Sequence, residues 1–352
     1  MNELSKVKYT YLVSAVAAFG GLLFGYDTAV IAGAIGYLQV KFELSPMLTG
    51  WAASSAIWGC VFGALFAGAL SDKYGRKKVL LLSGLLFTLS ALGSAVPDNL
   101  TQFVLARFIG GLGVGSASML SPLYIAEIAP AQIRGMLVTL YQLAIVFGIN
   151  IIYIVNYLIA NTHDQAWNVQ LGWRYMLGSE GIPAILFFIL LFFVPESPRW
   201  LVKENRSEEA LKILNKINRT EEIHEILEEI KETVNEEKGS FLDLFKPGIR
   251  KAMVVGCVLA FFSQVTGINA IIYYAPEIFK QVGFGSESAL FQTMIIGFVN
   301  MLFTLVAIRL IDYWGRGTLL IWGLSGMVSC LLGMGMFFYF EITSGPLLLL
   351  FI

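Results

Sequence analysis

Long apolar runs, separated by short polar segments, follow one another along most of the chain. A helix that crosses the hydrocarbon core of a bilayer needs about 20 mostly apolar residues. Runs of that kind lie near residues 10–36, 48–70, 79–97, 100–123, 136–160, 174–194, 252–280, 288–311 and 318–340. A further apolar run begins at Pro346 and reaches Ile352. The pattern predicts nine transmembrane spans and the beginning of a tenth.

The same runs predict helices rather than the strands of a membrane barrel. Lipid offers the backbone no water, so a spanning segment bonds internally as a helix or within a closed barrel. Barrel strands cross with about 10 residues of alternating polarity, whereas these runs are longer and continuously apolar. Charged residues make up 14% of the chain, against about 25% in soluble domains. We expect an all-α integral membrane protein.

Positively charged residues indicate how the spans are oriented, because cytoplasmic loops carry an excess of Lys and Arg. If the N-terminus is inside, the outer loops hold only Lys41, Arg174 and Lys280. The inner side then holds Lys6, Lys8, the basic loop 73–78, Arg134, the stretch 199–251, Arg309 and Arg316. The charges therefore predict a multi-pass protein with a cytoplasmic N-terminus.

Charge and cysteine content argue against several other classes of protein. The net charge of −1 provides no basic surface for nucleic acid. Cys60, Cys257 and Cys330 stand alone in apolar segments, so we interpret them as small buried hydrophobic residues rather than metal ligands. We recognise no nucleophile–base pair, and His163 and His224 lie in hydrophilic segments. We therefore expect neither an enzyme nor a cofactor.

One segment, 203–240, has the composition of a soluble protein. Its leucines and isoleucines recur every three or four residues between charges, which predicts short amphipathic helices. Ser207, followed by Glu208 and Glu209, is typical of a helix start. The simplest interpretation of the charges is a solvated helix face.

A short motif, D-x-x-G-R, occurs at two equivalent points of the chain. It extends from Asp72 to Arg76 and again from Asp312 to Arg316, each time after a pair of spans. Secondary transporters are commonly built from two halves that duplicate one another. Chance recurrence is the alternative, but the matched position favours duplication.

The duplication and the soluble segment together predict three parts. These are an N-terminal six-helix bundle, a cytoplasmic linker with short amphipathic helices and a partial C-terminal bundle, at 1–196, 197–250 and 251–352. The second half shows about three helices and the start of a fourth, so by symmetry about three helices are missing. The sequence alone leaves open whether the chain is a fragment or a natural truncation.

Two opposite charges lie inside predicted spans, Asp27 in the first and Arg107 in the fourth. An ionisable residue at membrane depth is energetically costly and is a functional hypothesis by default. Opposite charges in one bundle suggest an ion pair. A carboxylate beside an arginine stays ionised, and one separated from it in a low-dielectric site takes up a proton. The pair is therefore a candidate for proton coupling.

Two simpler interpretations of this pair stay open. It could be a static structural ion pair, or the glycines around Asp27 could place that residue near the outer end of its helix. Glu180, inside the sixth span, is a second buried carboxylate and a candidate for the proton path.

Uncharged polar side chains gather in the fifth and seventh spans. The fifth carries Gln142 and Asn150, and the seventh reads SQVTGINAIIYYAP from Ser263 to Pro276, where the proline is expected to interrupt it. Discontinuous helices often form the substrate site of a transporter. Amides donate and accept hydrogen bonds, as sugar hydroxyls do. The pattern favours an uncharged, polyhydroxylated ligand; the alternative is that the amides only hold helices together.

The glycines between Gly110 and Gly115 superficially resemble a dinucleotide fingerprint, GGLGVG. No strand precedes them, so the motif lacks the context that this function requires. Small residues at such spacing instead predict a close helix crossing.

Five runs carry a resemblance to a known family: GxxxDKxGRKK at 68–78, PLYIAEIAP at 122–130, GWR at 172–174, PESPRWL at 195–201 and GIN at 267–269. They resemble the sugar porter family of the major facilitator superfamily, and most of all its bacterial xylose–proton symporters. The likeness covers essentially the whole chain. It implies a two-bundle, rocker-switch transporter with one central site.

The resemblance also implies roles for individual residues. Asp27 matches the proton-coupling carboxylate, Arg107 its partner and Glu180 a carboxylate implicated in coupling. Positions that contact sugar in the family match Phe24, Gln142, Gln264, Asn269, Tyr273 and Asn300. A cytoplasmic salt-bridge network that closes the inner side matches Asp72, Arg76, Glu127, Arg134, Glu196, Arg199 and Arg316.

The chain also departs from the family pattern. Ser263 and Ile149 stand where the family usually has glutamine, which leaves the identity of the sugar open. Our reading is a proton-coupled monosaccharide symporter of the cell's inner or plasma membrane, monomeric, with no metal and no nucleic acid partner. A truncated non-transporting product, a sugar-binding sensor and a facilitative uniporter are the alternatives.

Overall fold

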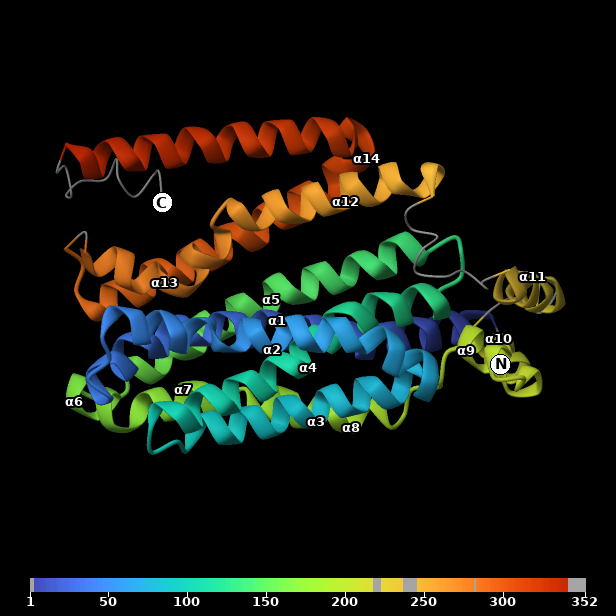
Figure 1. Cartoon of the computed structure of the whole chain (residues 1–352), viewed down its shortest axis with the longest axis horizontal. Coiled ribbons are helices and arrows are strands. Elements are labelled where there is room, and N and C mark those ends of the chain that lie inside the picture. The colour runs from blue at the N-terminus through green and yellow to red at the C-terminus, as the bar shows by residue number, and fades with distance from the viewer. Residues whose placement is uncertain (1–2, 218–222, 237–245, 282, 341–352) are drawn as a thin grey trace.

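The structure, a computed structural model, describes residues 3–217, 223–236, 246–281 and 283–340, which are almost entirely helical (Figure 1). Within these ranges nine segments are long and apolar enough to cross a bilayer: Ser5–Lys41, Pro46–Tyr74, Arg76–Ala95, Leu100–Ile128, Arg134–Ala160, Gln165–Leu191, Gly248–Gln281, Ser286–Ile311 and Gly317–Met336. The nine predicted spans are confirmed as helices, and the predicted start of a tenth lies outside the described residues.

The first five spans are single helices, and two of them start at a side-chain cap. They are α1 (Glu3–Lys41), α2 (Pro46–Tyr74), α3 (Arg76–Ala95), α4 (Leu100–Ile128) and α5 (Arg134–Ala160). Ser45 accepts a hydrogen bond from the Leu48 amide at the start of α2, and Asn99 accepts one from Gln102 at the start of α4. These side chains satisfy amides that a helix start leaves without partners.

The sixth span is irregular. It consists of α6 (Gln165–Trp167), the π-helix η1 (Asn168–Gly172), α7 (Trp173–Gly178) and α8 (Gly181–Leu191). Ser179 and Glu180 keep helical φ and ψ angles, but one helical hydrogen bond is missing there because Pro183 has no N–H to donate to the Ser179 carbonyl. The Ile182 amide donates to that carbonyl instead, at 3.3 Å. Glu180 therefore lies next to a tighter turn in which one regular helical hydrogen bond is missing.

Close approach of α2 and α4 depends on glycine. A Cβ on Gly59 or Gly63 of α2 would clash with backbone carbonyls of α4, and one on Gly111 or Gly115 of α4 would clash with carbonyls of α2. The two backbones therefore approach without intervening side chains. The glycine run of the fourth span serves helix crossing, as predicted.

α1 passes through the middle of the N-terminal helices and is the most deeply buried of the nine spans (Figure 1). Asp27 lies in its interior with 2% of its surface exposed, and the helix continues to Lys41. The alternative that placed Asp27 near a helix end is therefore wrong.

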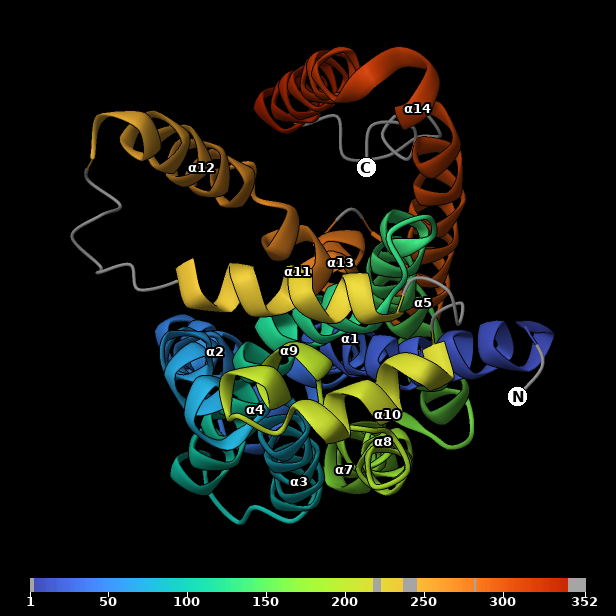
Figure 2. The same cartoon turned by 90° about the vertical axis from the view of Figure 1, so that its right-hand side faces the viewer.

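The polar segment forms α9 (Pro198–Lys203), α10 (Ser207–Ile217) and α11 (Ile223–Glu236). They lie at the same end of the molecule as the N-terminus (Figures 1 and 2). Leu214 of α10 and Leu227 of α11 are buried in the same apolar core as Val13 of α1. The predicted amphipathic helices and the helix start at Ser207 are confirmed; residues 218–222 and 237–245 lie outside the described ranges.

The last three spans are formed by α12 (Pro247–Val265), α13 (Ile268–Gln281) and α14 (Ser286–Tyr339), which bends at Gly315. The seventh span breaks at Gly267, whose φ of +80° suits a residue without a Cβ. The prediction of a break at Pro276 is wrong, since this proline lies inside α13. Its missing N–H frees the Ile272 carbonyl, and the Tyr153 hydroxyl of α5 donates to that carbonyl at 3.0 Å.

The C-terminal helices contact the N-terminal ones at one end only. α13 lies against α1 and the first part of α14 against α5, whereas α12 stands apart toward the end that holds α9, α10 and α11 (Figures 1 and 2). The side chains of α12 from Val254 to Val265 are exposed. The arrangement is a V that opens toward the N-terminus.

Candidate transport site

The predicted pair of charges in the membrane is present. Arg107 Nη1 donates to Asp27 Oδ1 at 2.5 Å, and Arg107 Nη2 donates to the Asp27 backbone carbonyl at 2.9 Å. Both side chains are 2% exposed. Arg107 Nε has no hydrogen-bond partner among the described residues. The guanidinium therefore contacts both the side chain and the backbone of α1 at this point.

Glu180 completes a buried set of three ionisable groups. It is 1% exposed and interacts electrostatically with both Asp27 and Arg107. Its Oε1 has no hydrogen-bond partner in the part of the chain that the structure describes. Two buried carboxyl groups thus lie within electrostatic range of one guanidinium, which is paired with Asp27.

A cavity of about 320 Å³ adjoins this set. Among its lining residues are six of the sequence-predicted ones: Phe24, Asp27, Arg107, Gln264, Asn269 and Tyr273. Asn269 Nδ2 donates to Gln264 Oε1 at 2.7 Å across the break at Gly267. The break of the seventh span therefore brings two amides together beside the buried charges.

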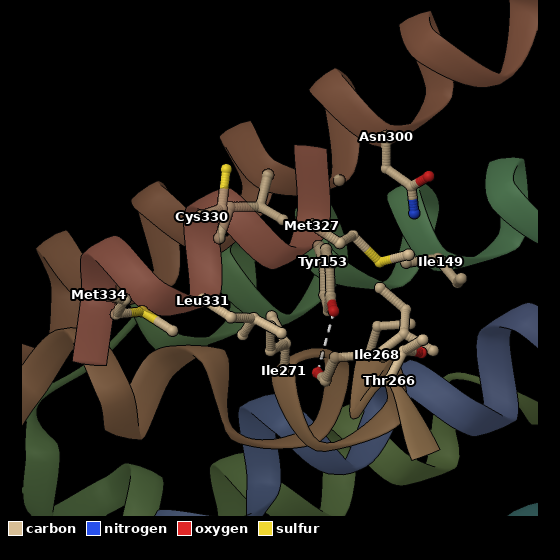
Figure 3. Close-up of a pocket in the computed structure, with 13 residues that line it drawn as sticks. Ile149, Tyr153, Thr266, Ile268, Ile271, Asn300, Met327, Cys330, Leu331 and Met334 are labelled. Carbon is tan, nitrogen blue, oxygen red and sulfur yellow. Dashed lines mark hydrogen bonds between the residues drawn. The ribbon is translucent and has the colours of Figure 1, made fainter. Parts of the chain in front are cut away.

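Two other predicted sugar contacts lie elsewhere. Asn300 lines a separate, largely apolar cavity of about 290 Å³ with Tyr153 and Met327, between α5, α13 and both limbs of α14 (Figure 3). Gln142 is exposed on α5 and lines neither cavity. The structure thus assembles four of the six predicted sugar contacts in one place.

The predicted cytoplasmic network centres on Arg76. Its Nε and Nη2 donate to the Glu127 carboxylate at 2.9–3.2 Å, and its Nη1 donates to Asp72 Oδ1 at 3.0 Å. The Arg76 and Glu127 side chains are 8% and 5% exposed, whereas Asp72 is 54% exposed. The buried contact of this network is therefore the one between Arg76 and Glu127.

Glu196 joins the same network through backbone groups. Its Oε1 accepts hydrogen bonds from the amides of Arg76, Lys77 and Ser197 at 2.9–3.1 Å. Burial raises the pKa of Glu196 above its ordinary value, although these amides favour the charged form. The carboxylate joins the start of α3 to the loop that precedes α9.

Other predicted members of the network are placed differently. Arg134 is exposed, and its Nε donates to the Ala129 carbonyl at 3.4 Å. Arg199 lies in the first turn of α9. The side chain of Arg316 lies outside the described residues.

Three residues of this region were missed by sequence reasoning. Lys203 pairs with Asp72 at 3.2 Å, and Trp200 Nε1 donates to the Asp72 carbonyl at 3.0 Å. The Tyr124 hydroxyl donates to the Pro195 carbonyl at 2.6 Å. The PESPRWL run gave a signal for Trp200 and the PLYIAEIAP run gave one for Tyr124, because each residue stands within its run. Lys203 carried no signal that pointed to Asp72.

The cysteines are less buried than predicted. Cys60 is half-buried and lines the cavity beside Asp27, whereas Cys257 and Cys330 are exposed on their helices. The correction has a simple cause, since α12 and the last span pack little against the other described helices. Among the described residues no group of three His, Cys, Asp or Glu side chains is placed to hold a metal ion.

A family of known proteins matches almost the whole chain. The model of a family described as "Sugar (and other) transporter" matches residues 13–352. The chain belongs to this sugar transporter family. Its family and its structural neighbours are transporters rather than enzymes.

Two curated members of the sugar transporter family are close relatives. The chain is 46% identical to the arabinose–proton symporter of Bacillus subtilis over 345 residues, covering 98% of this chain and 74% of the relative. It is 42% identical to the D-xylose–proton symporter of Escherichia coli K12 over 367 residues, covering 96% and 74%. The resemblance to sugar porters is therefore confirmed.

Solved structures of the family confirm the fold. A partially occluded, inward-open structure of the xylose transporter XylE from E. coli matches with a TM-score of 0.88 and 40% identity, over 97% of this chain and 82% of that one. XylE bound to 6-bromo-6-deoxy-D-glucose matches with a TM-score of 0.87 and 42% identity, over 98% and 78%. The fold is the all-helical transporter fold of the major facilitator superfamily.

Proposed function

We propose that this protein is a proton-coupled symporter that carries a monosaccharide across the membrane by alternating access. The observation that carries the proposal is the buried set of Asp27, Arg107 and Glu180 beside an amide-lined cavity. The relatives named as arabinose– and xylose–proton symporters support the same function. Pentoses are therefore the first substrates to test.

The charge balance of the site supports a role in proton coupling. With both carboxyl groups ionised, one guanidinium leaves an excess negative charge in a buried site, which is costly. One bound proton removes that excess. When sugar binding and closure of the bundles move Arg107 relative to Asp27, the balance between ion pair and proton changes. Proton binding thereby becomes linked to the conformation of the transporter.

The cavity chemistry suits a neutral sugar. Gln264 and Asn269 together offer amide donors and acceptors, and the Tyr273 ring provides an apolar surface. Arg107, the cation that lines this cavity, is already paired with Asp27, so a charged substrate would lack a free counter-charge. Phe24 completes the aromatic lining, with Gln142 and Asn300 proposed to approach the sugar in another conformation.

The V shape supports an inward-facing state. The bundles meet at the end away from α9–α11, through contacts that include the Tyr153–Ile272 hydrogen bond. We infer a cytoplasmic N-terminus, two bundles at 1–196 and 251–352 and a cytoplasmic linker at 197–250. The charges of Asp72, Arg76, Glu127, Arg134, Glu196, Arg199 and Arg316 would then close the cytoplasmic side in the outward-facing state. We propose that one copy of the chain is the transporting unit in the bilayer.

Sugar-induced proton movement tests this proposal. Purified protein is reconstituted in vesicles, and D-xylose, L-arabinose, D-glucose and the polyol xylitol are added outside while external pH is recorded. Symport predicts alkalinisation with at least one of the sugars. Sugar entry without a pH change would indicate a uniporter, and sugar binding without entry would indicate a sensor; either result would overturn the proposal.

A further inference from the structure

A short chain of hydrogen bonds connects the two helices that carry the buried carboxyl groups. The Tyr26 hydroxyl of α1 lies 2.8 Å from Ser179 Oγ, and Ser179 Oγ donates to the Met176 carbonyl at 2.5 Å. A serine hydroxyl has one hydrogen, which is used by the Met176 carbonyl. Tyr26 is therefore the donor and Ser179 the acceptor between the two helices.

The residues of this bond are next to the ionisable ones. Tyr26 precedes Asp27, and Ser179 precedes Glu180. Tyr26 is 3% exposed, so no water competes for its hydroxyl group. The bond therefore links the segment that carries Asp27 to the segment that carries Glu180.

The Tyr26–Ser179 hydrogen bond meets the sixth span where its helix lacks one regular hydrogen bond. A regular helix fixes the direction of its side chains through its backbone hydrogen bonds, and one of these bonds is missing beside Glu180, although the backbone angles there stay helical. The bond is missing because Pro183 has no N–H, which leaves the Ser179 carbonyl to a tighter 3.3 Å contact with Ile182. The helix is therefore less firmly held beside Glu180, and a contact from α1 can restrain it there.

We propose that Tyr26 is a positioning residue for proton coupling, because its hydrogen bond to Ser179 holds Glu180 in place beside Asp27 and Arg107. The inference rests on the proposed function of that site. The titratable or charged groups described as facing Glu180 are Asp27 and Tyr26 from α1 and Arg107 from α4. Tyr26 acts on Glu180 through Ser179 and is not among the residues that line the cavity proposed for the sugar.

The test compares Tyr26→Phe and Ser179→Ala with a matched control. Tyr141→Phe removes the same hydroxyl from a buried tyrosine whose Oη has no partner among the described residues. The readouts are the pH profile of uphill sugar uptake and the rate of sugar exchange at equal pH. Size-exclusion profiles and melting temperatures confirm that each variant is folded.

We expect Tyr26→Phe and Ser179→Ala each to lower uphill accumulation by about three- to tenfold, the size of one lost neutral hydrogen bond. The pH of half-maximal uptake should shift in both, with exchange retained, and the double variant should be no worse than either single one. Tyr141→Phe should behave as the parent. Unchanged pH profiles in folded Tyr26→Phe and Ser179→Ala would overturn the inference.

Asp27→Asn, measured in the same assay, separates this inference from the proposed function. If Asp27→Asn abolishes accumulation while Tyr26→Phe leaves it intact, the positioning role is wrong and the coupling site stands. If Asp27→Asn accumulates sugar as the parent does, the coupling site itself is wrong, and the inference is overturned with it.

Discussion

Arg107 holds Asp27 at two points, with Nη1 on the carboxylate at 2.5 Å and Nη2 on the backbone carbonyl at 2.9 Å. The carbonyl contact does not depend on the charge of Asp27. Protonation of the carboxyl group therefore weakens one of two bonds and leaves the other. The arginine stays near α1 while the ion pair changes, which suits a reversible proton site.

The effects of substituting Arg107 and Asp27 on the stability of the protein should be non-additive. Arg107→Gln leaves a buried carboxylate without its partner, which costs about 3–5 kcal/mol. Asp27→Asn in the same chain removes that stranded charge, so the double variant should be more stable than Arg107→Gln alone. Melting temperatures in detergent give the comparison. A double variant with a melting temperature below that of Arg107→Gln would contradict the ion pair.

The two carboxylates that contact Arg76 should contribute differently to the stability of the protein. Glu127→Ala breaks a buried, bidentate pair and should cost about 3 kcal/mol. Asp72→Asn affects a carboxylate that is 54% exposed, and should cost about 1 kcal/mol or less. Thermal unfolding of the two variants gives the order. An equal or reversed order would show that burial does not decide the strength of this network.

Glu196 should give the protein a pH-dependent stability. Burial raises its pKa above the ordinary value of 4.5. At a pH between these two values, the folded state therefore holds a proton that the unfolded chain has lost. Stability from this group therefore falls as pH rises from about 4.5 through the raised pKa, and is constant above it. Glu196→Gln has no such proton. Its melting temperature relative to the parent should rise with pH across this window.

An exposed glutamate provides the control for Glu196. The hydrogen bond from Arg206 lowers the pKa of Glu209, so the sign is reversed and stability from this group increases with pH. The melting temperature of Glu209→Gln relative to the parent should fall slightly as pH rises. A Glu196→Gln difference that is flat or falls with pH would contradict the assignment.

The Tyr153–Ile272 bond should favour closure of the end where the bundles meet. Tyr153→Phe leaves the carbonyl freed by Pro276 without its donor, a loss of about 1 kcal/mol. That energy corresponds to about a fivefold shift toward opening of this end. Spin labels at Thr162, just after α5, and at Gln281, the last residue of α13, report the distance between these two helix ends in a background without native cysteines. The distance distribution should shift to longer values.

Tyr157→Phe is the matched control on the same helix. Its ring packs on Phe291 at 5.7 Å between centroids, and the substitution keeps that ring. The distance distribution should stay that of the parent. If Tyr153→Phe also leaves it unchanged, the hydrogen bond does not contribute to closure.

Hydropathy alone was sufficient for the nine spans, because a lipid environment imposes a length and a composition that can be read locally. The Asp27–Arg107 pair was predictable for a similar reason, since opposite charges deep in apolar spans have few other ways to be compensated. The composition of the seventh span also indicated the coarse position of Gln264 and Asn269, which line the cavity beside Asp27.

Neutral contacts between distant residues were not predictable. Tyr26 and Ser179 are 153 residues apart, and Tyr153 and Ile272 are 119 apart. Hydroxyl groups have no charge sign that would reveal a partner in the sequence. The misplaced break at Pro276 has the same origin, because the hydroxyl that satisfies the freed carbonyl belongs to another helix. The exposure of Cys257 and Cys330 was likewise not predictable, because burial depends on neighbouring helices that a local pattern does not specify.

The account rests on Asp27 as the coupling carboxylate, and one measurement tests it most directly. Vesicles containing the parent or Asp27→Asn receive labelled D-xylose, or the sugar identified in the alkalinisation assay, under an inward proton gradient. The account predicts that the parent accumulates sugar above equilibrium, whereas Asp27→Asn only equilibrates it and still exchanges sugar across the membrane. Uphill accumulation by Asp27→Asn would contradict the account.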